Sequence, residues 1–223
     1  MNRHFLAASF ALLAGASQAN VLDFGNGPSV PSLCSSTADG LGSTVGCTNF
    51  GYFLQSYGDV AGVLDVTYSA PRYTDGRTLR WWASQYNDLY GVLWADGGDG
   101  DSRARIELKP LNGQEVTLTH FDLGAYSMTT RKTTVNIFAI GNPTALYSFS
   151  GAVGSGSTHA GFDLNVSSST GLWIEWQDSA YNVGIDNVTY LLRDVTGPVP
   201  EPSTYALLLA GLIAGGAVAR RRR

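Results

Sequence analysis

A dense group of aromatic side chains offers the clearest binding chemistry in the sequence. Three tryptophans and two tyrosines fall within fourteen residues, namely Trp81, Trp82, Tyr86, Tyr90 and Trp94. Flat rings stack on the apolar faces of sugars while neighbouring amides and carboxylates bond the hydroxyls, so this composition suits a polysaccharide site. Core packing is the alternative, because adjacent residues of a strand face opposite sides and one of Trp81 and Trp82 then points inward. We therefore expect either a partly exposed ligand platform or an aromatic part of the core.

Catalytic patterns are much weaker. The chain has no Gly-x-Ser-x-Gly elbow, and His120 and His159 are unspecific signals because two histidines can always be paired with some serine. Glu107, Glu115 and Glu175 are candidates for the paired carboxylates of glycoside cleavage, but solvent-facing strand positions explain them better. We expect a protein that is not an enzyme, and a secreted glycan-active hydrolase remains an alternative.

A short acidic loop raises the question of calcium. Residues 96–101 carry three aspartates separated by glycines, which is a composition that can surround a hard cation. The EF-hand pattern is not met, because Gly98 and Gly100 occupy positions where ligands are required. The loop is therefore either a looser calcium site or a solvated turn.

Composition excludes several classes of protein. The 223 residues are 44% hydrophobic and only 14% charged, which argues against intrinsic disorder and against a charged coiled coil. Between positions 20 and 198 there are nine basic and 17 acidic residues, a net charge of −8. Such a charge gives no basic field to hold phosphates, so nucleic acid is not an expected partner.

The body of the chain is patterned as strands. Apolar and polar residues alternate with a period of two in several segments, turn residues separate these segments, and no internal stretch keeps helical periodicity for more than about two turns. The clearest segments are residues 62–68, 104–109, 115–121, 134–140, 171–176 and 183–191. We expect eight to ten strands over residues 20–196, arranged as an all-β antiparallel β-sandwich of the jelly-roll kind.

Two cysteines lie thirteen positions apart, at Cys34 and Cys47. In an exported chain such a pair is expected to form a disulfide that closes an early loop and contributes about 3 kcal/mol. Free thiols or a metal site are the alternatives, although zinc would need more Cys or His ligands than the mature chain offers.

The N-terminus has the features of a secretory signal. Arg3 is followed by an apolar run over residues 5–16 and by small residues that suit cleavage after Ala19. Residues 1–19 are therefore expected to be a signal peptide rather than a first core helix.

The C-terminus has three features in a fixed order. An extended Pro200-Glu201-Pro202 element precedes an apolar segment over residues 205–219. As a helix this segment would be roughly 22 Å long, a little short of a bilayer core, and snorkelling side chains can make up the difference. The chain then ends in Arg220, Arg221, Arg222 and Arg223, which would stop transfer and stay on the cytoplasmic side. A buried core helix is the alternative.

This combination over residues 197–223 resembles the PEP-CTERM sorting signal of exported bacterial proteins. The resemblance implies a single transmembrane sorting helix, a transient stay in the inner membrane, and cutting by an exosortase-type enzyme that reads the Pro-Glu-Pro element. The mature protein would then reach the cell surface or the extracellular space.

The body is similar to the jelly-roll domains that often precede this signal, and through them to galactose-binding-like and carbohydrate-binding modules. The segments that carry this likeness are residues 104–108, 116–118, 121–124 and 184–188. The resemblance implies that Asp186 and Asp23 are candidate ligands of a structural calcium ion; no other cofactor is expected.

Taken together, the sequence predicts an exported cell-surface or matrix protein that associates with exopolysaccharide, as in a biofilm. A purely structural or protein-binding matrix component is the first alternative.

Overall fold

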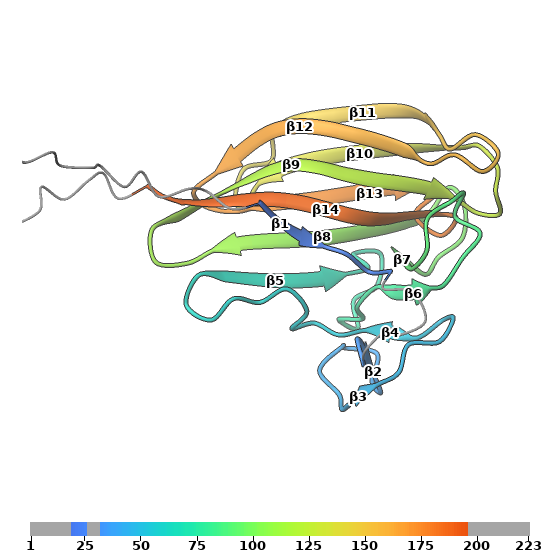
Figure 1. Cartoon of the computed structure of the whole chain (residues 1–223), viewed down its shortest axis with the longest axis horizontal. Helices are drawn as coiled ribbons and strands as arrows, with labels where there is room; N and C mark the ends of the chain where they lie inside the picture. The colour runs from blue at the N-terminus through green and yellow to red at the C-terminus, as the bar shows by residue number, and fades with distance from the viewer. Residues whose placement is uncertain (1–18, 26–31, 196–223) are drawn as a thin grey trace, which may run out of the picture.

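The computed structural model describes residues 19–25 and 32–195. The predicted signal peptide up to residue 18, the Pro-Glu-Pro element, the apolar segment and the four arginines lie outside these residues. The described chain forms two antiparallel sheets that face one another, with no helix in this part of the molecule (Figure 1). In residues 19–25 and 32–195, accordingly, no helix is long and apolar enough to cross a membrane.

The larger sheet has nine strands, in the order β12-β9-β14-β7-β6-β4-β2-β3, and β1 pairs with β14 beside this path. Its strands are β1 (Ala19–Leu22), β2 (Cys34–Ser35), β3 (Thr44–Val45), β4 (Tyr52–Phe53), β6 (Arg80–Trp82), β7 (Val92–Trp94), β9 (Gln114–Ala125), β12 (Ala160–Ser168) and β14 (Val183–Asp194).

The smaller sheet has five strands, in the order β11-β10-β13-β8-β5. They are β5 (Leu64–Ser69), β8 (Ser102–Pro110), β10 (Arg131–Ala139), β11 (Ala145–Val153) and β13 (Leu172–Asp178). Each neighbouring pair is antiparallel, so the two sheets confirm the predicted all-β antiparallel sandwich. The described residues form fourteen strands, more than the eight to ten expected, because several strands have only two or three residues.

The core lies between the sheets and follows the period of two. In β13 the side chain of Trp176 points inward and is fully buried, while Trp173 points outward and is half-buried. The indole N–H of Trp176 donates to the carbonyl oxygen of Val183 at 2.8 Å. The alternation seen in the sequence therefore assigns the two tryptophans of this strand to opposite faces, as a pleated strand requires.

All six segments with clear alternation are strands in the structure, within a few residues of the expected ends. Two nine-residue strands, β11 and β12, were not among them. Each is an edge strand that pairs on one side only, and its inward-facing residues are mostly half-buried. Apolar residues alternate in both, as at Phe162 and Leu164 in β12, so the period of two was present in the sequence although these two strands were missed.

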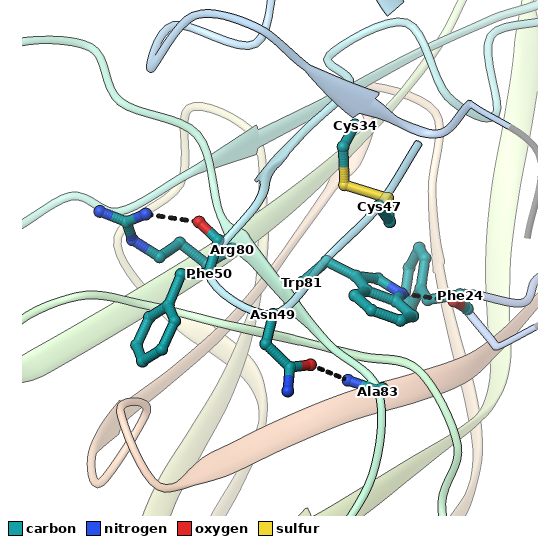
Figure 2. Close-up of a disulfide and its surroundings, with 8 residues drawn as sticks. All are labelled: Phe24, Cys34, Cys47, Asn49, Phe50, Arg80, Trp81 and Ala83. Atoms are coloured by element: carbon teal, nitrogen blue, oxygen red, sulfur yellow. Dashed lines mark hydrogen bonds between the residues drawn. A yellow bond between two sulfur atoms is a disulfide. The ribbon is translucent and has the colours of Figure 1, made fainter. Parts of the chain in front are cut away.

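The short strands β2, β3 and β4 gather below the long strands in Figure 1 and are tied by the predicted disulfide. Cys34 and Cys47 are bonded with an S–S distance of 2.04 Å (Figure 2). Cys34 is fully buried and pairs with Val45 in β3 and Phe53 in β4. The disulfide therefore attaches the loop after β3 to a strand that belongs to the core.

Candidate functional site

Of the five predicted aromatic residues, Trp81, Tyr86 and Trp94 are buried, Trp82 is half-buried and Tyr90 is exposed. Trp81 is buried in the core, where its indole N–H donates to the carbonyl oxygen of Phe24 at 2.8 Å (Figure 2). Trp82, Tyr86 and Trp94 line one pocket, while Tyr90 is 45% exposed and is not part of its lining. Because Trp81 and Trp82 are adjacent in β6, the pleat alone separates the core member from the pocket member.

The pocket lies at the end of the sandwich where β9 ends and β14 begins. It has a volume of about 140 Å³. Six of its seven lining residues are aromatic: Phe50, Trp82, Tyr86, Trp94, Tyr126 and Tyr181, with Asn182 as the seventh. These residues come from β6, β7, the loop after β6 and three further connections, so separate parts of the chain build one aromatic hollow.

Edge-to-face contacts hold the rings in place. The ring centroid of Trp82 is 4.7 Å from that of Phe50 and 5.6 Å from that of Tyr126. The ring of Trp94 stands perpendicular to that of Tyr181, with centroids 5.2 Å apart. Such pairs contribute about 0.5–1.5 kcal/mol beyond the burial of their area, so the walls of the pocket are pre-organised.

The pocket contains a buried donor that has no partner. Trp94 is 2% exposed, and its indole Nε1 makes no hydrogen bond within residues 19–25 and 32–195. By contrast, the indoles of Trp81, Trp173 and Trp176 each donate to an oxygen atom. An unsatisfied buried donor costs about 1–3 kcal/mol, and a ligand oxygen that reached this N–H would recover that cost.

Phe50 forms one wall and has an unusual backbone. Its φ is 70°, in the left-handed region that bulky side chains rarely adopt and that costs about 1–3 kcal/mol. The Phe50 N–H donates to the carbonyl oxygen of Trp81 at 3.1 Å, and the Arg80 guanidinium donates to the Phe50 carbonyl oxygen at 2.5 Å. The Ala83 N–H bonds the side-chain oxygen of Asn49, so the segment after the disulfide is fixed on both sides of Phe50 (Figure 2).

A buried amide positions Tyr86 on the opposite wall. The Asn87 side chain accepts from the Ala125 N–H at 2.6 Å and donates to the carbonyl oxygens of Thr129 and Gly156. The loop approaches β9 so closely that a Cβ at Gly124 would lie 2.2 Å from the Tyr86 carbonyl oxygen. Only glycine can therefore stand at that position without moving the loop.

The hydroxyl of Tyr86 remains protonated at all physiological pH values, because burial raises its pKa. This hydroxyl donates to the carbonyl oxygen of Tyr181 at 3.0 Å. The bond links the loop after β6 to the connection between β13 and β14 across the pocket.

The two aspartates named as candidate calcium ligands have other roles here. Asp186 is 4% exposed, and its Oδ1 accepts from the N–H groups of Phe24 and Asn187 at 2.9 and 2.8 Å. Asp23 accepts from the Gly25 N–H. Burial raises the pKa of Asp186 to about 7. The Asp186 side chain thus connects the end of the first strand to β14.

No group of three or more His, Cys, Asp or Glu side chains in the described part of the chain is arranged to hold a metal ion. The acidic loop agrees with this, because its three carboxylates point to different arginines. Asp96 pairs with Arg77 and Arg80, Asp99 with Arg131, and Asp101 with Arg72. The loop is accordingly a turn held by ion pairs.

The two histidines both contact aspartates. His120 lies 2.8 Å from Asp163 and 3.0 Å from Asp122, and His159 lies 2.7 Å from Asp88 and 3.3 Å from Asp122. Both histidines therefore contact the buried carboxylate of Asp122 in β9. Neither histidine lines the aromatic pocket.

The three candidate glutamates are paired as well. Glu175 is buried and accepts from the Arg105 guanidinium at 2.7 and 3.2 Å, and Glu115 accepts from Arg193. Glu107 accepts from the indole of Trp173, whose ring is covered by Arg105 at 4.2 Å. A hollow of about 430 Å³ lies beside Trp173. The indole N–H of Trp173 and one face of its ring already have partners in the protein.

The sequence analysis missed four lining residues of the pocket: Phe50, Tyr126, Tyr181 and Asn182. Tyr126 directly follows β9, and Tyr181 and Asn182 directly precede β14. Aromatic residues at the ends of two expected strands were the available signal, but only the pairing of β9 with β14 brings those ends together.

Residues 198–223 match the family model of the PEP-CTERM protein-sorting motif. The motif confirms the predicted sorting signal, and it implies that the chain is exported, sorted to the cell surface and processed by an exosortase. No curated protein matches the chain.

Among solved structures the body resembles carbohydrate-binding modules in its β-sandwich. A CBM4 structure shows 14% identity and a TM-score of 0.29, covering 59% of this chain and 84% of its own. A family 11 module from Clostridium thermocellum, in complex with a mixed-linked tetrasaccharide, shows 9% identity and a TM-score of 0.30, covering 63% and 94%.

An exo-β-1,3-galactanase from Phanerochaete chrysosporium with galactose shows 11% identity and a TM-score of 0.31, covering 68% of this chain and 30% of the galactanase. The chain thus corresponds to less than a third of that enzyme. With scores of this size, the likeness concerns the fold and supports no inference about a ligand.

Proposed function

We propose that this protein is a non-enzymatic component of the cell surface or extracellular matrix that associates with exopolysaccharide through its aromatic pocket. The observation that carries the proposal is the hollow with six aromatic walls, one of which, Trp94, has a buried indole N–H without a partner. Aromatic faces stack on the apolar faces of a sugar ring. The export motif supports the proposal because it takes the chain to where such polymers are found.

The chemistry of the pocket favours binding over hydrolysis. Its lining contains no carboxylate and no histidine, whereas glycoside cleavage needs two acidic groups on either side of the bond. The candidate acids elsewhere, Glu107, Glu115 and Glu175, each accept bonds from an arginine or an indole. We therefore propose that the pocket retains a polymer and does not turn it over.

Retention on insoluble exopolysaccharide tests this proposal. Trp82→Ala removes a half-buried ring that contacts Phe50 and Tyr126, and we expect at least a tenfold loss of retention by a protein that is still folded, although its melting temperature falls because the ring contacts are lost. Trp173→Ala is the matched control, since this half-buried tryptophan lies on the outer face of the other sheet. Equal retention by Trp82→Ala and the unchanged protein would favour the structural or protein-binding alternative.

We also propose the route by which the protein reaches the cell surface. The apolar segment at residues 205–219 would hold the chain in the inner membrane until an exosortase-type enzyme cuts at Pro200, Glu201 and Pro202. Mass spectrometry of the exported protein should show that residues 1–19 and the final arginines have been removed. A surface form that keeps both ends would contradict this route.

A further inference from the structure

A second hollow adjoins the aromatic pocket. It has a volume of about 540 Å³, and Arg77, Arg80, Asp96 and Gly98 are among its lining residues. Tyr181 lines both hollows, so this residue lies where they meet. The two hollows are therefore neighbouring parts of one surface.

Arg80 connects the two parts physically. Its guanidinium donates to the carbonyl oxygen of Phe50 at 2.5 Å and lies 6.0 Å from the ring of Trp94, and both of these residues line the aromatic pocket. In the opposite direction Arg80 bonds Asp96 in the second hollow at 2.7 Å. A ligand that extends past Tyr181 would therefore pass from the apolar lining of the aromatic pocket to the polar lining of the second hollow.

We infer that the second hollow is an extension subsite for the next unit of a neutral glycan chain, which crosses Tyr181 from the aromatic pocket. This inference rests on the proposed function of that pocket. The aromatic pocket, at about 140 Å³, is smaller than the roughly 300–1,000 Å³ of ordinary ligand sites, so a glycan chain that fills it would extend beyond it.

The polar groups of the second hollow suit hydroxyl groups. The two oxygens of Asp96 are held by different arginines, Oδ2 by Arg77 at 3.2 Å and Oδ1 by Arg80 at 2.7 Å. The guanidinium groups of Arg77 and Arg80 already have partners, but each oxygen of Asp96 has a second lone pair, to which a sugar hydroxyl can donate. Gly98 adds no side chain, and no atom lies within 4 Å of the position of its absent Cβ, so the hollow stays open.

The charges favour a neutral chain over an anionic one. Arg77 and Arg80 are balanced by Asp75 and Asp96, with which they form ion pairs. The chain between positions 20 and 198 also has nine basic and 17 acidic residues, which repels polyanions at a distance. An acidic sugar would thus gain no net attraction in this subsite.

Calorimetric titration of the exported protein with oligosaccharides of increasing length tests the inference. The probes are gluco- and galacto-oligosaccharides of one to six units, with oligogalacturonides of the same lengths as the anionic series. We expect neutral oligomers to bind about tenfold more tightly than monosaccharides, with little change when the salt concentration is raised about tenfold.

Arg77→Ala should remove this gain with length, because Arg77 lines the second hollow and not the aromatic pocket. Arg193→Ala is the control for lost positive charge, since Arg193 pairs with Glu115 on β9. Equal affinity for short and long neutral probes, tighter binding of oligogalacturonides, or an Arg77→Ala variant that keeps the gain would overturn the inference alone. The absence of binding by every probe, of any length, would overturn the proposed function as well.

Discussion

The five-stranded sheet and the pocket end of the molecule are built in contrasting ways. Strands β8, β10 and β13 are seven to nine residues long, each buries one face along most of its length, and each is paired with neighbours on both sides. At the pocket end, β4, β6 and β7 have two or three residues each, and Phe50, Gln85 and Asn87 have positive φ. Regular strands supply a rigid scaffold, and strained connections on that scaffold place the aromatic walls.

The largest effect is expected in the sandwich. Trp176→Ala removes a fully buried indole and its bond to Val183, and we expect the free energy of unfolding to fall by about 3–5 kcal/mol. Urea denaturation measures this loss. A fall below about 1 kcal/mol would show that the sandwich repacks around the gap and is less rigid than its regular pairing indicates.

Loss of the disulfide should lower the stability of the whole protein and should loosen the pocket end more than the five-stranded sheet. Replacing Cys34 and Cys47 by serine should lower the unfolding free energy by about 2–4 kcal/mol. Because Phe50 follows Cys47 by three residues, we also expect weaker retention on polysaccharide while the protein is still folded. Hydrogen exchange should locate the extra mobility in residues 44–54; faster exchange spread evenly over β8, β10 and β13 would contradict a local role.

The buried Asp186 carboxyl should make stability depend on pH. Its pKa is raised to about 7, whereas an unfolded aspartate has a pKa near 3.9. The folded state therefore binds the proton more tightly, and its stability is fully present below about pH 4 and is lost as the pH rises through about 7. Between these limits the unfolding free energy should fall by at most about 1.4 kcal/mol per pH unit.

Asp186→Asn should flatten this dependence, because an amide accepts the Phe24 and Asn187 bonds without titrating. Chemical denaturation at several pH values compares the two proteins, and the difference between them isolates Asp186 from His120, His159 and Asp122. Parallel pH profiles would assign the dependence to other groups.

The smallest change in stability is expected at Phe50, where binding should nevertheless become weaker. Phe50→Gly relieves the left-handed backbone, so the unfolding free energy should stay within about 1 kcal/mol of the original or rise. Retention on polysaccharide should fall because the ring contacts with Trp82 and Trp94 are lost. A variant that binds as well as the original would show that this wall is dispensable.

The period of two located the long strands because each has one face that is buried continuously along its length, as in β8 and β13. Strands of two or three residues have no period to detect. The sequence also located Trp82, Tyr86 and Trp94 through their density, but it could not separate them from Trp81 and Tyr90, because strand direction and burial depend on pairing partners elsewhere in the chain.

Local chemistry alone identified the alternating strands, the partner of each cysteine, and the sorting motif at the C-terminus, since each depends on residues that are close in sequence. Only the tertiary structure brought Tyr126 and Tyr181 beside Trp82 and Trp94, and only it left one buried indole N–H without a partner. The reason is physical: a pocket is made where chain segments far apart in sequence meet, and the register of β9 with β14 sets where they do so.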